Sequence, residues 1–416
     1  MADGAVLEGC LARAGYRQAG SISSADVIVM NTCAVKGPTE NRMIEILKRV
    51  PRRKKLIVTG CLPLVNLERL QKEVPFSAVV GPAAGEKIVE IVKRVSNDET
   101  VIAIEKNADD LPNLNLPRVQ MSPVTGIVPV NYGCLGSCAY CCVVFARGRL
   151  RSYNVQDIVR RVTVDLDSGL KEFWITSQDT GCYGRDKGTN LAALLRAVCD
   201  IDENFRVRVG MMTPNSVLDM LEELVEAFQD ERIFKFIHLP VQCGEDEVLK
   251  RMRRFYRVSD FKKAVQAFRT NFPGITLATD VICGFPGETE EDFQRTLSLI
   301  EEVKPDIVNV SKFFARPKTA ATRMCKDSVP LSEIKVRSIE ASRLAKRLSF
   351  ERNQGWVDWT GEILVDEVGK VPGSWVGRNF AYKPVVVKST SKLIGKFINV
   401  KIVEAFPTYL QGTIVQ

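Results

Sequence analysis

The chain has 416 residues, with 45% hydrophobic and 26% charged side chains, a balance that excludes disordered and fibrous proteins. Its apolar runs all fall short of the roughly 18 residues that a membrane-spanning helix needs, and its first residues lack the pattern of a secretory signal, so we expect a cytoplasmic protein without a membrane partner. The net charge of +8 allows a polyanionic partner but does not require one.

The first hundred residues alternate short apolar runs with helical patterns. The apolar runs predict buried strands at 26–31, 55–60 and 77–81. The periodic segments predict helices at 38–50, 65–73 and 85–95. This alternation predicts a small α/β domain with a parallel sheet over residues 1–104. Residues 105–122 show no periodicity and predict a linker.

A longer α/β region follows at residues 123–354. The predicted strands are 127–131, 172–176, 205–210, 234–239, 275–282 and 306–311. Helical patterns such as 216–228 and 289–303 separate nearly every pair, and a basic helix at 331–353 closes the region. Six such units predict a partial or complete βα barrel, whose chemistry belongs at the C-terminal ends of its strands.

The composition changes again at residues 355–416, which are rich in Val, Ile, Thr and aromatic residues. Alternating runs at 361–368, 382–389 and 398–405 predict strands, and no helical period is present. A small all-β barrel is the natural interpretation. The predicted fold class is therefore α/β: an N-terminal parallel sheet, a central partial (βα)6 barrel and a C-terminal β-barrel.

Twelve cysteines stand against a single histidine, His238. An intracellular chain keeps its thiols reduced, so this number favours metal binding or thiol chemistry over disulfides. One histidine argues against mixed Cys/His zinc sites and a Ser-His-Asp triad, and we interpret His238 as a hydrogen-bonded core residue. Ordinary packing is expected for cysteines outside the motifs described below, namely Cys10, Cys182, Cys199, Cys243, Cys283 and Cys325.

Cys134, Cys138 and Cys141 form a C-x3-C-x2-C motif on a glycine-containing loop just after a predicted strand. Three thiolates at this spacing can hold three irons of a 4Fe–4S cluster and leave the fourth iron open. Reductive cleavage of S-adenosylmethionine requires such an open iron. A structural zinc site is the alternative, but zinc needs four ligands and Cys142 is too close to Cys141 to complete a tetrahedron comfortably.

The order of motifs along nearly the whole chain resembles the radical S-adenosylmethionine methylthiotransferase family. The matching segments are NTC at 31–33, TGC at 59–61, the cysteine loop, HLPVQCGEDEVLKRMRR at 238–254 and DVICGFPGETEEDF at 280–293. The loop sequence GCLGSCAYC and the following ARGRLRSY at 146–153 resemble the archaeal and eukaryotic branch, which acts on N6-threonylcarbamoyladenosine in tRNA.

The resemblance implies a radical enzyme that converts this nucleoside at position 37 into its 2-methylthio derivative. It implies an N-terminal methylthiotransferase domain, a radical barrel and a TRAM-like RNA-binding domain, with 4Fe–4S clusters and S-adenosylmethionine as cofactors. The implied partners are tRNA, an electron donor and a sulfur source, and no DNA. Three alternatives stay open. The enzyme could act on isopentenyladenosine or on a ribosomal-protein aspartate, or the chain could be a non-catalytic iron–sulfur RNA-binding protein.

The resemblance also implies a second 4Fe–4S cluster, with Cys33 and Cys61 as two of its three ligands. In the family the first ligand lies a few residues ahead of an acidic position that Asp3 resembles, which places it upstream of Met1. Cys10 is no substitute, because its helical pattern points it toward a packed face. We therefore expect an incomplete second cluster in the chain as written, and favour a displaced start over a natural variant.

Candidate contacts to S-adenosylmethionine lie near the C-terminal ends of predicted barrel strands. The candidates are Gln178, Asp179, Asp280, Gly284 and Gly287. The glycines would allow a ligand to approach the backbone closely, although the same residues also suit an ordinary turn.

Basic segments give the candidate RNA contacts. KRMRRFYR at 250–257 mixes cations with aromatic rings, and RGRLR at 147–151 adds cations beside the cysteine loop. Cations neutralise phosphates and aromatic rings stack on unpaired bases, although a single charge run is more often a solvated face. The predicted RNA contacts are Arg147, Arg149, Arg253, Arg254, Lys388 and Lys392.

Overall fold

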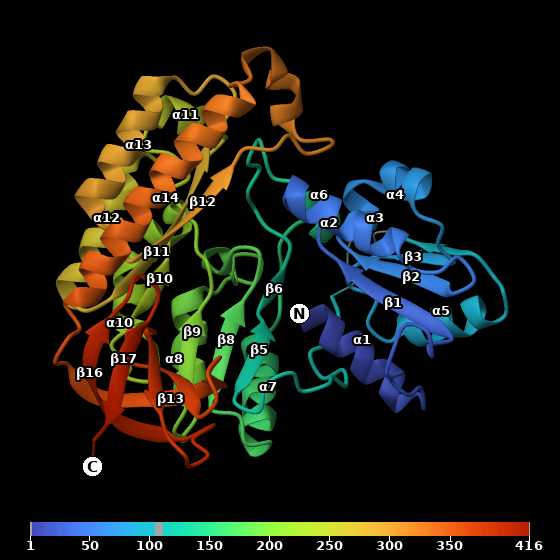
Figure 1. Ribbon diagram of the computed structural model, residues 1–416, viewed down its shortest axis with the longest axis horizontal. Helices are drawn as coiled ribbons and strands as arrows, with labels where there is room; N and C mark the ends of the chain where they lie inside the picture. The colour runs from blue at the N-terminus through green and yellow to red at the C-terminus, as the bar shows by residue number, and fades with distance from the viewer. Residues whose placement is uncertain (1, 105–110, 416) are drawn as a thin grey trace. The chain divides into compact units, whose positions relative to one another are not determined.

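The computed structural model describes residues 2–104 and 111–415 and divides the chain into two compact units (Figure 1). Unit 1 comprises Met1–Met121, Asn131–Tyr153 and Phe314–Arg323; unit 2 comprises Ser122–Val130, Asn154–Phe313 and Met324–Gln416. Within the described residues, no helix is long and apolar enough to cross a membrane. The predicted domain limits divide the chain differently and stay a prediction.

Unit 1 contains the predicted parallel sheet, with four strands in the order β1-β2-β3-β4. The strands are β1 (Val27–Thr32), β2 (Lys55–Gly60), β3 (Ala78–Val80) and β4 (Val101–Ala103), the last of which the sequence analysis missed. The helices are α1 (Ala2–Arg13), α2 (Gly37–Lys48), α3 (Leu62–Val65), α4 (Leu67–Glu73) and α5 (Lys87–Ser96).

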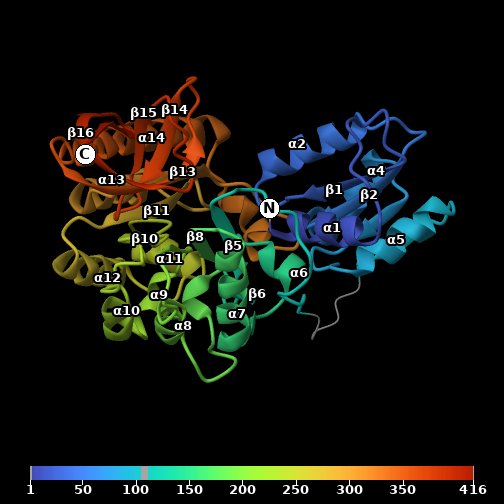
Figure 2. The same cartoon turned by 90° about the horizontal axis from the view of Figure 1, so that it is seen from below.

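Both faces of this sheet are covered, which explains its continuous apolar strands. Leu56 and Val58 of β2 pack with α2, α3 and α4, whereas Ile57 packs with α1 and α5 (Figure 2). Alternate residues of a strand point to opposite faces, so both sides of β2 are buried. Cys10 on α1 is 2% exposed in the second of these cores, which confirms its predicted packing.

The cysteine loop and the described part of the predicted linker also fold with unit 1. The cysteine loop lies between β6 (Asn131–Tyr132) and α6 (Val143–Arg147), and β6 pairs with β7 (Arg151–Ser152). The described part of the predicted linker has no regular element but packs on the unit, since the N–H of Val119 donates to the carbonyl oxygen of Ala5. Residues 105–110 lie outside the described residues.

Unit 2 contains two three-stranded parallel sheets, β5-β8-β9 and β10-β11-β12. The strands are β5 (Thr125–Pro129), β8 (Glu172–Thr176), β9 (Arg206–Val209), β10 (Phe236–His238), β11 (Thr276–Cys283) and β12 (Ile307–Lys312). Backbone hydrogen bonds from Phe234 to Val207 and from Met212 to His238 join the two sheets. The six strands confirm the predicted partial barrel.

Helices and short 3-10 turns connect these strands. They are α7 (Val155–Asp167), η1 (Thr180–Cys182), α8 (Leu191–Cys199), α9 (Pro214–Leu218), α10 (Leu221–Ala227), α11 (Asp246–Arg251), α12 (Val258–Asn271), α13 (Glu290–Val303), η2 (Ala320–Asp327) and α14 (Leu331–Gln354). The single helix predicted at 216–228 is wrong: α9 and α10 are separate, because Met220 leaves the helical backbone region with φ −139° and ψ 28°.

The C-terminal segment forms a closed five-stranded barrel in the order β13-β14-β15-β17-β16, as predicted. Its strands are β13 (Thr360–Val368), β14 (Ser374–Arg378), β15 (Pro384–Lys388), β16 (Phe397–Ala405) and β17 (Leu410–Ile414). Four of the strand pairs are antiparallel and β15 pairs with β17 in parallel, so the closed barrel leaves no free edge and encloses a core that includes Ile363, Val385 and Ile402.

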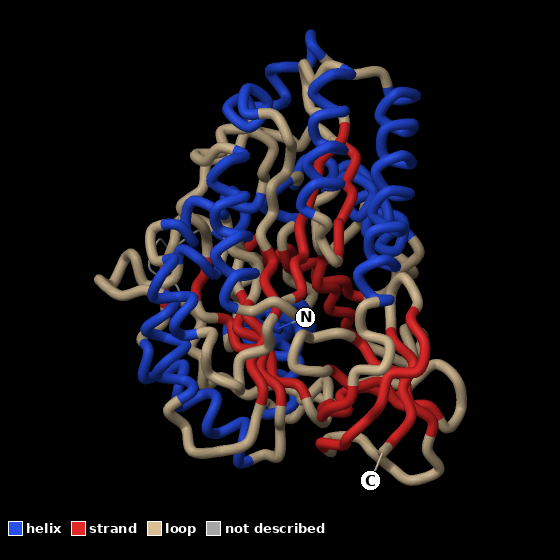
Figure 3. The backbone as a smooth tube through the Cα atoms, turned by 90° about the vertical axis from the view of Figure 1, so that its left-hand side faces the viewer, coloured by secondary structure: helices blue, strands red, loops and turns tan. Residues whose placement is uncertain are grey.

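The C-terminal barrel lies against the N-terminal ends of the central strands (Figures 1 and 3). The Tyr382 hydroxyl donates to Glu172, the first residue of β8, and Lys383 pairs with the buried Asp306, just before β12. The N–H of Lys235, just before β10, donates to the carbonyl oxygen of Phe380. The C-terminal ends of the strands are therefore the end of the central barrel that this contact does not cover.

Candidate functional site

The loop with Cys134, Cys138 and Cys141 provides a cradle for sulfur ligands. The N–H of Gly136 donates to Cys134 Sγ at 3.2 Å, and that of Val143 donates to Cys141 Sγ at 3.4 Å. A Cβ added at Gly136 would stand 3.3 Å from Cys134 Sγ and 3.6 Å from Cys138 Sγ. Glycine thus keeps the space between two thiols open, and the residues present fit a 4Fe–4S cluster.

The three thiols lie within electrostatic range of one another. Burial, with smaller contributions from the neighbouring cysteines, raises the pKa of the Cys141 thiol to about 12, against the opposing hydrogen bond from the N–H of Val143. Bound iron would favour the thiolate instead, since a coordinating thiol is deprotonated. Among the residues that the structure describes, no three Cys, His, Asp or Glu side chains converge on a single metal ion. A cluster of several irons gives each cysteine its own iron, so its ligands need not converge on one point.

Cys33 and Cys61 follow the neighbouring strands β1 and β2 and come together at the same edge of the sheet. The N–H of Cys61 donates to the carbonyl oxygen of Thr32 at 2.9 Å. Gly60 has φ 95°, and a Cβ there would lie 2.2 Å from that oxygen, so only glycine allows this approach. Burial raises the pKa of Cys61, and the nearby Cys33 raises it as well. The structure therefore brings the two cysteines of the NTC and TGC motifs together.

Arg147 forms an ion pair within unit 1. Its side chain is 15% exposed and pairs with Asp3, and its guanidinium lies 5.2 Å from the centre of the Tyr132 ring. The Tyr132 hydroxyl donates to Asp3. Burial raises the pKa of Cys61, and the charge of Arg147 and a hydrogen bond from it oppose that rise. The predicted contact of Arg147 with RNA stays a prediction.

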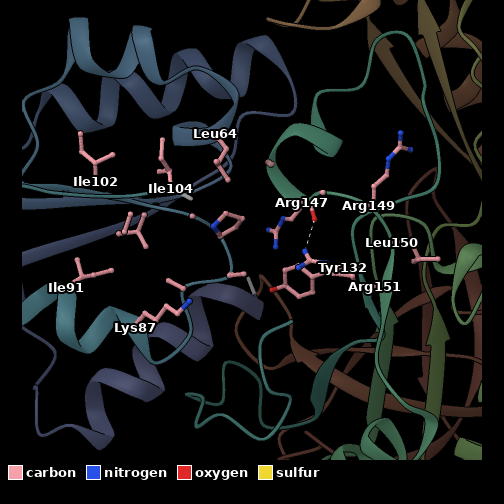
Figure 4. A pocket seen from close by; sticks show the side chains of 18 residues that line it. Leu64, Lys87, Ile91, Ile102, Ile104, Tyr132, Arg147, Arg149, Leu150 and Arg151 are labelled. Carbon is pink, nitrogen blue, oxygen red and sulfur yellow. Dashed lines mark hydrogen bonds between the residues drawn. The ribbon is translucent and has the colours of Figure 1, made fainter. Parts of the chain in front are cut away.

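A cavity of about 650 Å³ adjoins Arg147 within unit 1 (Figure 4). Apolar side chains from the sheet and its helices line one side, including Ile91, Ile102 and Ile104. Arg147, Arg149 and Arg151 line the other side. Two of the predicted RNA contacts, Arg147 and Arg149, are therefore in the lining, and of these two Arg149 is the exposed one. The cavity lies beside the sheet edge that carries Cys61.

Cys142 and Arg316 join distant parts of unit 1. Arg316 is 5% exposed, pairs with the buried Glu40 and donates to the carbonyl oxygen of Ala34. Cys142 is 2% exposed, and its thiol points to the same carbonyl oxygen. The segment with Arg316 is more than two hundred residues from Glu40 in sequence, so no local pattern could predict this contact.

Polar side chains from the adjacent strands β10, β11 and β12 of unit 2 meet toward the C-terminal ends of these strands. Asp280 Oδ1 lies 3.0 Å from His238 Nε2 and accepts a hydrogen bond from Asn309 Nδ2 at 2.7 Å. His238 is thus hydrogen-bonded, as predicted, but it belongs to this polar group. Asn309 was missed, although its register opposite Asp280 could have identified it once the strands were aligned.

Other predicted contacts to S-adenosylmethionine have protein partners. Asp179 is 4% exposed, and its carboxylate accepts hydrogen bonds from Gly181 and Thr213. A Cβ at Gly284 would lie 2.2 Å from Ile334, and one at Gly287 would lie 2.6 Å from Arg251. These glycines approach protein side chains, which agrees with the turn interpretation. Gln178 is half-buried just after β8.

The remaining predicted RNA contacts differ in exposure. Arg253, Lys388 and Lys392 are exposed, whereas Arg254 is half-buried with its guanidinium 4.9 Å from the centre of the Tyr256 ring. The cysteines of unit 2 expected to pack in the interior are buried at Cys182, Cys199, Cys243 and Cys283. The side chain of Cys325 lies outside the described residues.

Three family patterns match the chain. Residues 128–300 match the Radical SAM superfamily, residues 1–81 match the Uncharacterized protein family UPF0004, and residues 360–415 match the TRAM domain. The first covers five of the six central strands and the cysteine loop, and the third covers the closed C-terminal barrel.

Curated relatives match over the full length. The probable threonylcarbamoyladenosine tRNA methylthiotransferase of Pyrococcus horikoshii is 39% identical over 416 residues, which is 100% of this chain and 96% of that protein. The threonylcarbamoyladenosine tRNA methylthiotransferase of Homo sapiens is 34% identical over 99% of this chain and 71% of its own length.

Solved structures share the fold at low identity. The radical S-adenosylmethionine methyltransferase TsrM from Kitasatospora setae aligns with a TM-score of 0.57 and 15% identity, over 77% of this chain and 73% of that chain. The cobalamin-dependent S-adenosylmethionine radical enzyme OxsB aligns with a TM-score of 0.53 and 13% identity, over 81% of this chain and 53% of that chain.

Proposed function

We propose, on the premise that this chain belongs to the threonylcarbamoyladenosine tRNA methylthiotransferase family, that it converts N6-threonylcarbamoyladenosine at position 37 of tRNA into its 2-methylthio derivative. The observation that carries the proposal is the three-cysteine cradle around Gly136 in a chain that matches these relatives over its full length. The target is an unactivated C–H bond of adenine, which acid–base chemistry alone does not break.

Cys134, Cys138 and Cys141 would hold the first cluster. When bound, a 4Fe–4S cluster with one open iron supplies the reductive cleavage of S-adenosylmethionine and hence the radical. The N–H groups of Gly136 and Val143 donate to two of the sulfurs, and such hydrogen bonds stabilise negative charge on thiolate ligands. The loop thus fixes both the positions and the charge of its sulfur atoms.

Asp280 and Gln178 are the proposed contacts to S-adenosylmethionine in unit 2. Asp280 keeps 27% of its side chain exposed, and His238 and Asn309 hold its carboxylate in one orientation. A carboxylate fixed in this way can accept hydrogen bonds from hydroxyl or amino groups of a ligand. Its position near the C-terminal ends of the barrel strands is where barrel active sites are built.

Cys33 and Cys61 would contribute to a second cluster that serves the sulfur-transfer step. Arg147 donates toward Cys61 and would neutralise part of the cluster's negative charge. We propose that these two thiolates alone hold the cluster poorly. Anaerobic reconstitution of residues 1–416 tests this: iron for one cluster supports the proposal, and iron for two clusters contradicts it.

The substrate partner is tRNA, as the relatives' names and the TRAM match imply. Exposed cations proposed to contact it are Arg149, Arg253, Lys388 and Lys392. We further propose a cytoplasmic location and two more partners, an electron donor and a sulfur source, because the reaction consumes both electrons and sulfur.

Nucleoside analysis tests the proposed reaction. tRNA from cells that lack the gene should contain N6-threonylcarbamoyladenosine without its 2-methylthio derivative, and expression of the gene should restore the derivative. Loss of a 2-methylthio-isopentenyladenosine signal instead, or an unmodified ribosomal-protein aspartate, would identify one of the other substrates. No cleavage of S-adenosylmethionine under reducing conditions would support a non-catalytic RNA-binding role.

A further inference from the structure

The helix α11 (Figure 1) is followed by Arg253 at a position of positive φ where glycine is usual. The N–H of Arg253 donates to the carbonyl oxygen of Lys250, and that of Arg254 donates to Leu249, both at 2.9 Å. This pair of bonds is a Schellman motif, and Arg253 takes its left-handed position with φ 56°. Glycine adopts this conformation without strain, so the arginine side chain is kept at a conformational cost.

Residues 252–257 then alternate between the interior and the solvent. The inward members are Met252, Arg254 and Tyr256, and the outward members are Arg253, Phe255 and Arg257. Phe255 is 73% exposed, more than any other phenylalanine among the large exposed side chains. The outward face is therefore an aromatic ring with an arginine on each side.

The inward residues fix this face to the central barrel. Tyr256 is 6% exposed, and its hydroxyl lies 2.9 Å from the carbonyl oxygen of Pro240 and 2.8 Å from that of Val241. The guanidinium of Arg254 donates to the same hydroxyl. Pro240 and Val241 follow β10, so the anchor lies at the C-terminal ends of the barrel strands. Burial raises the pKa of the nearby Asp179, and the charge of Arg254 opposes that rise.

Phe255 also lines a hollow of about 580 Å³. Two carboxylates in the hollow serve backbone N–H groups: Asp246 accepts from Val258 and Asp260 accepts from Arg257, both at 2.8 Å. These acids disfavour a phosphate inside the hollow, but their remaining lone pairs can accept from a ring amino group. A base in the hollow with its phosphates on the outer arginines suits this distribution of charge.

We infer that Phe255 is a stacking platform for one unpaired base of the RNA substrate, and that Arg253 and Arg257 contact the phosphates on either side of it. The inference rests on the proposed function and refines it, because Arg254 becomes a positioning residue rather than an RNA contact. Single-stranded RNA loops are recognised by stacking on aromatic side chains combined with cationic contacts to the backbone. A phenylalanine between two arginines on a fixed support provides both.

Binding of the full chain to a synthetic anticodon stem-loop RNA, and to a fully paired RNA duplex of the same length, tests the inference. Phe255→Ala should weaken stem-loop binding about fivefold to a hundredfold, because base stacking supplies that much, and leave duplex binding unchanged. Phe255→Trp should keep stem-loop binding. Arg253→Gly should remove about one phosphate contact from the salt dependence of binding while the melting temperature is unchanged or higher.

Leu331→Ala is the matched control, because Leu331 is 79% exposed and lies at the start of α14. It should bind both RNAs like the parent chain. Parent-like stem-loop binding by Phe255→Ala, or an equal loss on duplex, overturns the stacking inference, and an unchanged salt slope for Arg253→Gly overturns the phosphate contact. Displacement of the stem-loop by poly-glutamate as readily as by single-stranded RNA would point to an acidic protein partner and would also overturn it. Failure of the proposed function is separate, since it would show as no 2-methylthio product from the parent chain while these binding differences persist.

Discussion

Unit 1 holds exposed and half-buried cysteines, whereas the cysteines of unit 2 whose side chains the structure describes are all buried. In unit 1, Cys33 is exposed and the three cysteines of the cradle are half-buried on a loop, while Cys10, Cys61 and Cys142 are buried. In unit 2, the buried cysteines are Cys182, Cys199, Cys243 and Cys283. A thiol acts as a ligand only where it can lose its proton and face a partner, whereas a sealed thiol behaves as a small apolar group. Cys283 is buried although it ends β11, so the motif context of a cysteine, rather than its position at the end of a strand or the number of cysteines, separates candidate ligands from packing.

The largest effect should come from the cradle. Cys138→Ala should abolish formation of 5′-deoxyadenosine from S-adenosylmethionine, because two thiolates cannot keep the cluster intact with one open iron. Cys134→Ala and Cys141→Ala should do the same in an anaerobic assay of the reconstituted protein. Cys283→Ala in unit 2 is the control and should retain the activity. Full cleavage of S-adenosylmethionine by any cradle variant would contradict the assignment of these cysteines as cluster ligands.

The pair at the sheet edge should separate the two reactions. Cys61→Ala should lose the 2-methylthio product but keep 5′-deoxyadenosine formation, because the cradle is intact. Both products are measured in one reaction by liquid chromatography with mass detection, for the parent chain and the variant side by side. Loss of 5′-deoxyadenosine as well would mean that the two groups of cysteines are not independent.

Unit 2 also buries the carboxyl group of Glu172, and its ionisation should affect the stability of the folded chain. Burial first and the charge of Asp366 second raise the pKa of Glu172 to about 7, although Trp174, Arg378 and Tyr382 oppose that rise. The folded state then binds the proton more tightly than the unfolded chain, so this contribution to stability is present below the ordinary pKa of 4.5 and is lost as pH rises toward about 7. Glu172→Gln removes the ionisation and keeps an oxygen that can accept from Trp174.

We therefore expect Glu172→Gln to be more stable than the parent chain at pH 8, by up to about 3 kcal/mol, and similar to it at pH 5. Denaturant unfolding of unit 2 at the two pH values measures the difference. An equal difference at both would show that ionisation of Glu172 does not matter, and would remove this carboxyl from the comparison.

The smallest effect should come from a sealed thiol. Cys283 is 1% exposed and packs with Phe293, Leu297 and Ala341. Cys283→Ala removes one buried sulfur and should lower the free energy of unfolding by about 1 kcal/mol, with unchanged iron content after reconstitution. A loss of iron in this variant would contradict the assignment of unit 2 cysteines to packing.

Local patterns predicted much of this fold, and distant contacts account for what they missed. Strands such as β2 and β8 were found at their observed limits, because a short apolar run between polar turns is sufficient evidence. β4 was missed although its three residues are apolar, as those of β3 are, and the break at Met220 depends on the backbone angles of one residue.

In the candidate site, too, local motifs were predicted from the sequence, whereas contacts between distant residues were not. The cysteine motifs carry their spacing in the sequence, so the cradle and the pair at the sheet edge were identified. The ion pair of Arg147 with Asp3 joins residues that are 144 positions apart, and the hydrogen bonds of Asp179 depend on the neighbouring strand. Composition showed that Arg147 is basic and Asp179 polar, but only the folded chain shows which partner each one contacts.

The buried contacts of Tyr382 and Lys383 have a consequence for the RNA itself. They attach the C-terminal barrel to one end of the central strands, and Phe255 is anchored at the other end. The eight residues of β11 between these ends measure roughly 26 Å at about 3.3 Å per residue. An RNA that contacts both the C-terminal barrel and Phe255 must extend over at least that length. A folded stem-loop can do so, whereas an isolated nucleoside or dinucleotide cannot.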